Sequence, residues 1–179
     1  MAHSMGPEIT LASPDDVLEM EEVLYQTWLV TYPNEEHNVT EDDIHVKYRG
    51  RFDPLMIARR KMLVGSGIGG MRYLIARKES KIVGVCFVHG NEHFNHLQAL
   101  YVLPGFQQQG VGGALWNEAR KYLDLSRAIF LSVAVYNHRA IAIYTHLGFV
   151  RSGKEYIDER FRFKSGSIIP EIEMVLRPQ

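Results

Sequence analysis

The chain has 179 residues, of which 46% are apolar and 23% are charged, as expected for one soluble globular domain spanning 1–179. The 20 basic and 21 acidic side chains give a net charge of −1, which argues against the positive charge that nucleic-acid binding usually requires. The longest apolar runs are much shorter than the roughly 20 residues of a membrane-spanning helix, so we also expect no membrane association.

The first third of the chain is predicted to be helical. Residues 13–16 (Ser-Pro-Asp-Asp) are typical of a helix start, and apolar residues at helical spacing extend that helix to about Thr31. Thr40 and Asp53 mark two further helix starts, and the third helix should end at Gly65.

Strands and helices alternate in the rest of the chain. Residues 72–78 and 81–88 are rich in β-formers and are joined by a polar turn, which predicts an antiparallel hairpin. The later elements expected are a strand at 97–102, a helix through 115–123, a strand at 129–135, a helix at 137–147, and strands at 149–156 and 172–176. This order predicts a mixed α/β domain.

Residues 97–115 (LQALYVLPGFQQQGVGGAL) contain a strand, a glycine-rich turn and the start of a helix. The glycines at 110, 112 and 113 have no Cβ atoms, so main-chain amides there can approach a ligand closely. Free amides and the positive end of a helix dipole favour a phosphate group at such a turn. Two nucleotide-binding motifs fit less well, because a P-loop needs Gly-Lys-Ser/Thr and a dinucleotide fingerprint needs a glycine where Leu115 stands.

Two segments of the chain resemble a known family, the GCN5-related N-acetyltransferases (GNAT). Residues 107–112 (QQQGVG) resemble its motif A, Gln/Arg-x-x-Gly-x-Gly/Ala, and residues 132–149 (SVAVYNHRAIAIYTHLGF) resemble its motif B. The resemblance covers about residues 97–150. It implies the GNAT fold, a three-layer α-β-α arrangement of the mixed α/β class with a mostly antiparallel, splayed central sheet. It also implies acetyl-CoA as the cofactor and a primary amine as the acceptor.

The resemblance assigns the cofactor to three parts of the chain. The extended pantetheine arm would pair with a strand edge, the pyrophosphate would lie at the glycine-rich turn, and the residue that caps the motif B helix would also reach the cofactor. The implied cofactor-binding residues are Leu100, Tyr101, Val102, Gln107, Gln108, Gln109, Gly110, Val111, Gly112, Gly113, Asn137 and Tyr144.

Tyr144 stands at the family's general-acid position, where its phenol would protonate the departing CoA thiolate. The alternative is a tyrosine that only packs its helix on the sheet. Many relatives have a glutamate base near position 96 or 98, where this chain has His96 and Gln98, so we expect His96 to accept a proton. The neighbouring candidates are His89, Glu92 and His93. The histidine spacings match no metal-binding helix, so no metal is expected.

The single cysteine, Cys86, lies in an apolar run at 82–88 and is expected to be a buried core residue. We therefore expect direct acetyl transfer and no acetyl-cysteine intermediate. One cysteine cannot form an internal disulfide, which favours the reducing cytoplasm. Residues 1–5 lack lysine, arginine and an apolar segment, so they do not resemble a secretory signal and are interpreted as a cloning remnant.

Charge is distributed unevenly along the chain. Residues 1–50 contain eleven acids and two bases, a net charge of −9, whereas residues 51–179 contain ten acids and 18 bases, a net charge of +8. One interpretation, without a functional role, is that the acidic residues of 1–50 form a solvated helix face. The functional one is an acceptor site, since carboxylates beside aromatic faces suit a cationic amine.

The resemblance implies an acceptor site built from the first helices, the loop between them and the late strands, and the early part of that region is residues 28–49. The residues predicted to bind the acceptor are Trp28, Tyr32, Glu35 and Glu36. The stretch at 27–32 also resembles PaiA-type spermine/spermidine acetyltransferases, which favours a polyamine or another small polycationic amine. The alternatives are a peptide or protein N-terminus as the acceptor, and a non-catalytic sensor that binds acetyl-CoA. A homodimer is compatible with the sequence.

Overall fold

The computed structural model describes residues 6–178, so the interpretation of residues 1–5 as a cloning remnant lies outside the described residues. The strands are β1 (Glu8–Leu11), β2 (Met71–Lys78), β3 (Lys81–Gly90), β4 (Asn95–Val102), β5 (Ile129–Ala134), β6 (Val150–Ile157) and β7 (Pro170–Leu176). The α-helices are α1 (Val17–Thr31), α2 (Glu41–Arg51), α3 (Pro54–Ser66), α4 (Val111–Ala119) and α5 (His138–His146).

Two of the three helix starts predicted from polar residues are confirmed by hydrogen bonds, whereas at the first Pro14–Asp16 form a 3₁₀ turn that leads into α1 at Val17. The Thr40 hydroxyl accepts a hydrogen bond from the Asp43 amide at 3.2 Å, and the Asp43 carboxylate accepts one from the Thr40 amide at 3.0 Å, which forms a capping box at α2. The Asp53 carboxylate accepts from the Leu55 amide at 2.9 Å and caps α3. Helix α4 is shorter than predicted, because the chain tightens into a 3₁₀ turn after Ala119.

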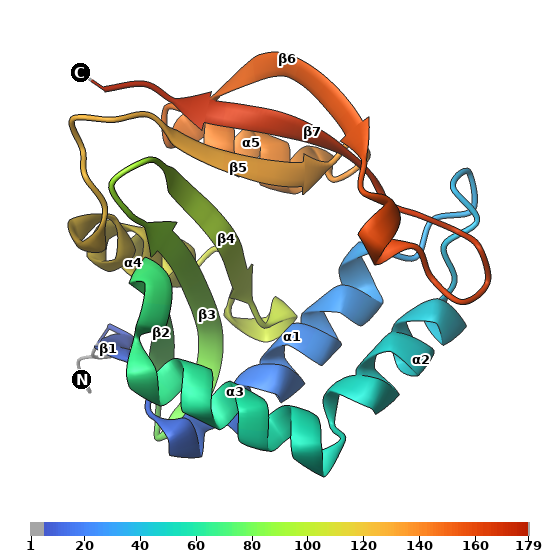
Figure 1. Ribbon diagram of the computed structural model, residues 1–179, viewed down its shortest axis with the longest axis horizontal. Coiled ribbons are helices and arrows are strands. Elements are labelled where there is room, and N and C mark those ends of the chain that lie inside the picture. Colours follow the sequence, from blue (N-terminus) through green and yellow to red (C-terminus); the bar gives the residue numbers. More distant parts are fainter. Residues whose placement is uncertain (1–5, 179) are drawn as a thin grey trace.

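A seven-stranded sheet in the order β1-β2-β3-β4-β5-β7-β6 forms the centre of the molecule. Only β4 and β5 pair in parallel, and their pairing covers just Asn95–Leu97 and Ile129–Leu131. Beyond these residues the two strands separate, as Figure 1 shows. The splayed, mostly antiparallel sheet is therefore confirmed. Strand β1 was not predicted, because four residues are too few to show a strand period.

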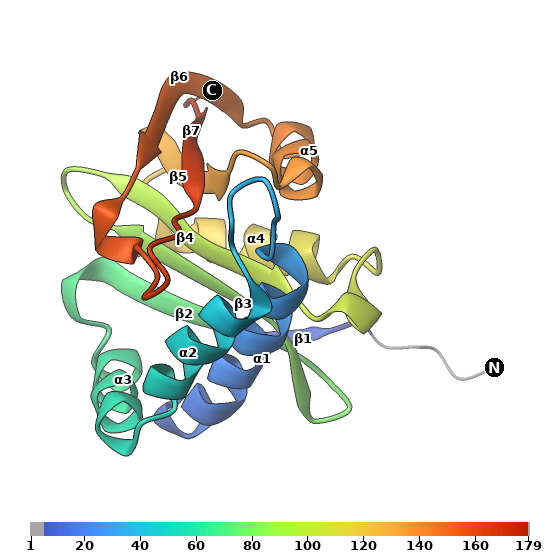
Figure 2. The same ribbon diagram turned by 90° about the vertical axis from the view of Figure 1, so that its right-hand side faces the viewer.

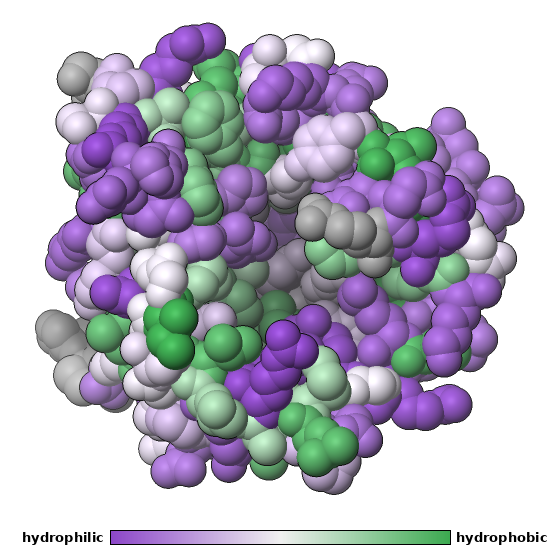
Figure 3. All heavy atoms as spheres, in the orientation of Figure 1, coloured by the Kyte–Doolittle hydropathy of each residue, from purple (hydrophilic) through white to green (hydrophobic). Residues whose placement is uncertain are grey.

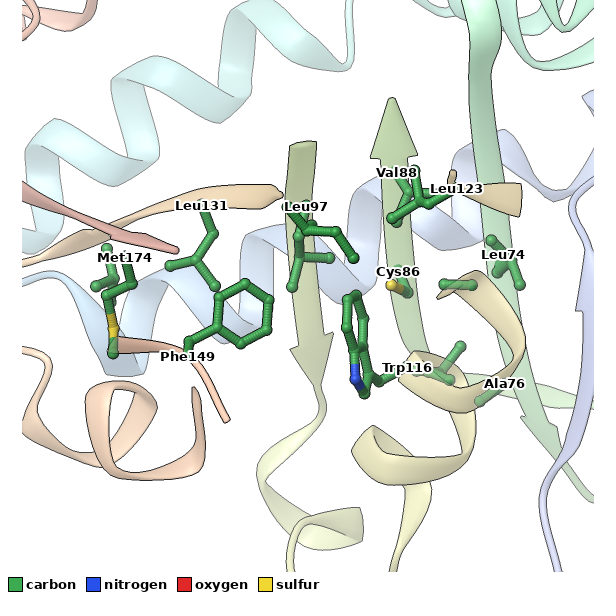
Figure 4. Close-up of a cluster of buried hydrophobic side chains, with 14 of the residues drawn as sticks. Leu74, Ala76, Cys86, Val88, Leu97, Trp116, Leu123, Leu131, Phe149 and Met174 are labelled. Atoms are coloured by element: carbon green, nitrogen blue, oxygen red, sulfur yellow. The ribbon is translucent and has the colours of Figure 1, made fainter. Parts of the chain in front are cut away.

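Helices cover both faces of the sheet, which gives the expected three layers (Figures 1 and 2). On one face α1 and α2 pack over β2 to β4, and on the other α4 and α5 pack over the centre of the sheet. Figure 4 shows the hydrophobic core between the sheet and α4, where Trp116 of α4 lies between Cys86 and Phe149. The rings of Trp116 and Phe149 are 5.6 Å apart. This packing fixes α4, and with it the preceding turn, against the splayed strands.

Candidate active site

The turn between β4 and α4 has a backbone shape suited to an anion. Gln108 and Gly110 both have positive φ, at 61° and 79°, so φ alternates in sign along this turn, as it does in anion-binding nests. The Gln107 side-chain amide donates to the Val102 carbonyl at 2.8 Å, and the Gln109 side-chain amide donates to the Gly105 carbonyl at 2.9 Å. These two hydrogen bonds hold the turn against the residues that precede it.

The amino terminus of α4 offers donors and open space. The Ala114 amide bonds to the Gly110 carbonyl at 2.9 Å, so the amides before it lie in the first turn, where a helix has no internal acceptors. A Cβ atom at Gly110 or Gly113 would meet no heavy atom within 4 Å. The Lys78 ammonium reaches this turn by donating to the Gln109 side chain at 2.8 Å. The turn therefore combines free amides, a helix dipole and a cation.

The edge of β4 that faces the gap is set by its pairing with β3. The Leu103 amide donates to the Val83 carbonyl at 2.9 Å, and antiparallel pairs alternate, so Leu100 and Val102 belong to the pairs that do not bond across to β3. Their main-chain groups point toward the gap between β4 and β5. A bulge opposite Phe87 places Gln98 on the surface, where its side chain is exposed.

Aromatic side chains from distant parts of the sequence meet at the gap. The hydroxyls of Tyr32 and Tyr101 are 2.6 Å apart, the Tyr136 hydroxyl donates to the Tyr32 carbonyl at 2.9 Å, and the Trp28 and Tyr32 rings are 4.3 Å apart. Burial first, and then the neighbouring Tyr101, raise the pKa of Tyr144 well above its ordinary value of 10. The structure thus brings the predicted residues Trp28, Tyr32, Tyr101 and Tyr144 together.

Asn137 and His96 lie at opposite ends of the splayed region. The Asn137 side chain accepts a hydrogen bond from the Ala140 amide at 3.1 Å and caps α5, as predicted. His96 lies within the short paired stretch of β4 and β5, opposite Phe130, and its buried Nδ1 has no hydrogen-bond partner among residues 6–178. Burial lowers the pKa of His96 below 6.5, against the opposing effect of the Glu173 carboxylate, so the imidazole is neutral at pH 7.

A family profile described as the acetyltransferase (GNAT) family matches residues 22–149. The chain belongs to the GNAT family. Members of this family use acetyl-CoA, as the sequence analysis expected. No curated protein sequence matches this GNAT chain.

Solved structures share the fold of this GNAT protein over nearly its whole length. A PaiA N-acetyltransferase from Thermoplasma acidophilum, crystallised with coenzyme A, is 21% identical with a TM-score of 0.75, covering 97% of this chain and 99% of that one. The ribosomal-protein-S18-alanine N-acetyltransferase from Escherichia coli is 17% identical with a TM-score of 0.62, covering 97% and 94%. At these identities the likeness establishes the GNAT fold.

Two predicted acceptor residues of this GNAT chain lie apart from the aromatic group. Glu35 and Glu36 are exposed in the loop between α1 and α2, whereas Trp28 and Tyr32 face the gap. The surface is hollowed at the centre of the face shown in Figure 3, over the region where Figure 1 places that gap. Among residues 6–178, no helix is both long and apolar enough to cross a lipid bilayer.

Several polar side chains near the candidate site of this GNAT chain were not predicted from the sequence. They are Lys78, which reaches the glycine-rich turn, and Tyr136, Tyr156, Glu171 and Glu173, which come from the chain after β5. One signal could have found the two glutamates. In β7 they alternate with the buried Ile172 and Met174, so both must lie on the sheet face opposite α4 and α5.

Proposed function

We propose that this GNAT protein transfers the acetyl group of acetyl-CoA directly to a primary amine. The observation that carries the proposal is the coincidence of three features at one gap. These are the free edge of β4, the amino terminus of α4 and the Tyr144 phenol. Each has a separate use in acetyl transfer, and their convergence in one place is what the reaction needs.

The residues at the gap fit the parts of acetyl-CoA. The Gln107 amide already donates to the Pro104 carbonyl, so the amides from Gln108 to Gly113 and the nearby Lys78 ammonium would hold the pyrophosphate without a metal ion. The main-chain groups of Leu100 and Val102 would pair with the pantetheine amides as a neighbouring strand does. A main-chain amide near Val102 would then donate to the thioester carbonyl oxygen as negative charge develops there.

The acceptor must react as a neutral amine. The neutral imidazole of His96 takes one proton from the acceptor's ammonium form, directly or through water, and later releases it to solvent. Acetyl-CoA, when bound, supplies the acetyl group as a thioester. As the nitrogen forms its bond to carbon and the carbon–sulfur bond breaks, Tyr144 protonates the departing sulfur. The next proton lost by the nitrogen restores the phenol, leaving an amide and the CoA thiol.

Cys86 supports direct transfer because its thiol is unsuited to attack. The side chain is fully buried in the core beside Trp116, and this burial raises the pKa of the thiol above its ordinary value of 9.0. We expect Cys86→Ala to keep at least about half of the wild-type kcat, at a cost of roughly 1 kcal/mol in stability for the small cavity. Steady-state thiol release and thermal unfolding measure the two effects. Mass-spectrometric detection of an acetyl group on Cys86 would instead support the covalent route.

Polyamines and other small polycationic amines are the acceptors that we propose first. Trp28 and Tyr32 present aromatic faces at the end of α1, and organic cations bind such faces favourably. The exposed Glu35 and Glu36 lie in the adjoining loop and would attract a polycation over a longer range.

A peptide N-terminus is the second candidate, and Lys47 favours it. The Lys47 ammonium lies 5.0 Å from the centre of the Trp28 ring and has no acidic partner among the described residues. Burial, followed by the charges of Arg51 and Arg60, lowers the pKa of Lys47. An unpaired cation beside the acceptor region would suit an amine that also carries a carboxylate, as a short peptide does.

Thiol release from acetyl-CoA tests these proposals. We expect turnover with spermidine and spermine that exceeds turnover with short peptides by at least about tenfold, a difference of about 1.4 kcal/mol in transition-state binding. Turnover with peptides alone would overturn the polyamine assignment and favour the second candidate. Tight binding of CoA without turnover of any amine would favour a sensor, and failure to bind CoA would overturn the proposed function as a whole.

A further inference from the structure

Glu171 is a half-buried carboxylate that the acetyl-transfer steps leave unused. It lies opposite Ala134 of β5 and Tyr156 of β6. Its neighbour Ile172 points into the core beneath α4 and α5, so the Glu171 side chain lies on the other face of the sheet, which α1 covers. Figure 1 shows this end of β7 beside the carboxyl-terminal end of α1. The side chain therefore faces the same side as the aromatic group at the gap.

Three linked tyrosines lie near Glu171. Tyr136 follows Ala134, the β5 partner of Glu171, by two residues, and its hydroxyl bonds to Tyr32, which bonds to Tyr101. Burial raises the pKa of Tyr32, Tyr101 and Tyr136, in the last case to about 12, and the Glu171 charge adds to each increase. The carboxylate is therefore within electrostatic reach of all three phenols. The hydroxyls of these tyrosines are committed elsewhere, since Tyr32 and Tyr101 bond to each other and Tyr136 donates to a carbonyl.

The Glu171 carboxylate itself has no hydrogen bond or ion pair within residues 6–178. Burial raises its pKa above the ordinary 4.5, and the nearby Asp158 adds to the increase, so the negative charge is poorly compensated. A buried charge without a partner costs free energy, which a ligand of opposite charge recovers on binding. A lone carboxylate near aromatic rings is suited to an organic ammonium ion, which gains an ion pair and ring contacts together.

A metal ion fits this place less well than an organic cation does. Oxygen-binding metals take several oxygen ligands at once, and residues 6–178 contain no group of three His, Cys, Asp or Glu side chains placed to share one ion. One carboxylate near aromatic rings is enough for an ammonium group.

We propose that Glu171 binds the ammonium group of the acceptor amine, with the rings of Tyr32, Tyr101 and Tyr136 near it. This inference rests on the proposed acetyl transfer and names the contact by which the acceptor is recognised. It moves that contact from the loop carboxylates Glu35 and Glu36 to the start of β7. The acceptor then approaches from the side of α1 and β7, while the cofactor occupies the gap.

Glu171→Gln tests the proposal, because it keeps the shape of the side chain and removes its charge. The probe is butylammonium, titrated calorimetrically into protein saturated with CoA, so that no acetyl group is available for transfer. We expect its affinity to fall by about 10- to 100-fold in Glu171→Gln, the loss of one charge-assisted contact. Glu171→Asp keeps a carboxylate, so its affinity for butylammonium should lie between those of wild type and Glu171→Gln. With acetyl-CoA, the KM of the acetylated amine should rise by a similar factor and kcat should change less.

Two controls distinguish binding at the Glu171 carboxylate from binding at another carboxylate and from apolar binding. Glu155→Gln removes an exposed carboxylate on β6 that lies opposite Ile172, on the other face of the sheet, and should leave the affinity for butylammonium unchanged. Butanol, the uncharged analogue, should bind weakly to every variant. Equal affinity of wild type and Glu171→Gln for butylammonium would overturn the inference and leave the proposed function intact. Wild type that binds no CoA, or that acetylates no amine, would overturn the proposed function itself.

Discussion

Replacing Tyr144 with Phe should lower kcat by about 100- to 1,000-fold, the usual contribution of one positioned proton donor. The departing thiolate would then have to take its proton from water. Burial and the neighbouring Tyr101 raise the pKa of Tyr144 above 10, so the phenol stays protonated throughout the neutral range. Activity should therefore show no loss from ionisation of Tyr144 as the pH rises toward 10. Steady-state thiol release with an active amine measures the effect.

The same substitution should leave folding and cofactor binding nearly unchanged. The Tyr144 ring packs edge-on against Phe149 at 5.9 Å, and Phe keeps that contact. The Tyr144 hydroxyl has no hydrogen-bond partner in the described part of the chain, so its removal leaves no donor or acceptor unpaired. The matched control is Tyr122→Phe, which alters an exposed tyrosine just beyond α4. An unchanged kcat in Tyr144→Phe would show that this tyrosine only packs α5 on the sheet.

Local sequence signals predicted the helix starts and the glycine-rich turn because each depends on residues close together in the chain. The capping box of α2 needs only Thr40 and Asp43, and the cap of α5 needs only Asn137 and Ala140. The short strand β1 is different, since its only support is pairing with β2, some 60 residues later in the chain. Such pairing leaves no local pattern in four residues.

The aromatic group at the gap could be predicted only in part. Trp28 and Tyr32 were expected near the acceptor, and Tyr101 near the cofactor, but the bond between Tyr32 and Tyr101 joins residues 69 positions apart. Glu171 was missed for the same reason. Alternation in β7 assigns its side chain to a face, whereas its closeness to Tyr32 depends on how β7 and α1 lie in the fold.

The acidic character of residues 1–50 has a partly structural origin. Glu21 is buried and pairs with Arg51 at 2.7 Å and with Arg60 at 3.1 Å, and Asp16 pairs with Arg77. These carboxylates hold α1 to α2, α3 and β2, and they are not available to an acceptor. The uneven charge along the sequence therefore overstates the acidity of the acceptor surface. With fewer carboxylates available there, the proposed contact of Glu171 with the acceptor contributes a larger share of the attraction for a cation.

Gly113→Glu should weaken CoA binding by at least about 100-fold and stabilise the fold at the same time. Gly113 lies in the first turn of α4, is exposed, and has no heavy atom within 4 Å of the position of a Cβ. A glutamate there interacts favourably with the helix dipole and removes the entropic cost of glycine, together about 1 kcal/mol. The same carboxylate would place a negative charge near the pyrophosphate, and two like unit charges about 5 Å apart repel by about 3 kcal/mol at an effective dielectric constant of about 20.

The control variant Gly113→Ala separates these two effects. It should raise the melting temperature as the glutamate does, while its Kd for CoA stays within about threefold of wild type, because alanine adds no charge and the space around the Cβ is open. Calorimetric titration with CoA and thermal unfolding of the three proteins give the comparison. Equal affinity of Gly113→Glu and wild type would mean that the pyrophosphate binds away from α4. A gain in stability together with the loss of affinity is the combination that only a ligand site at this helix terminus produces, since a misfolded variant would lose both.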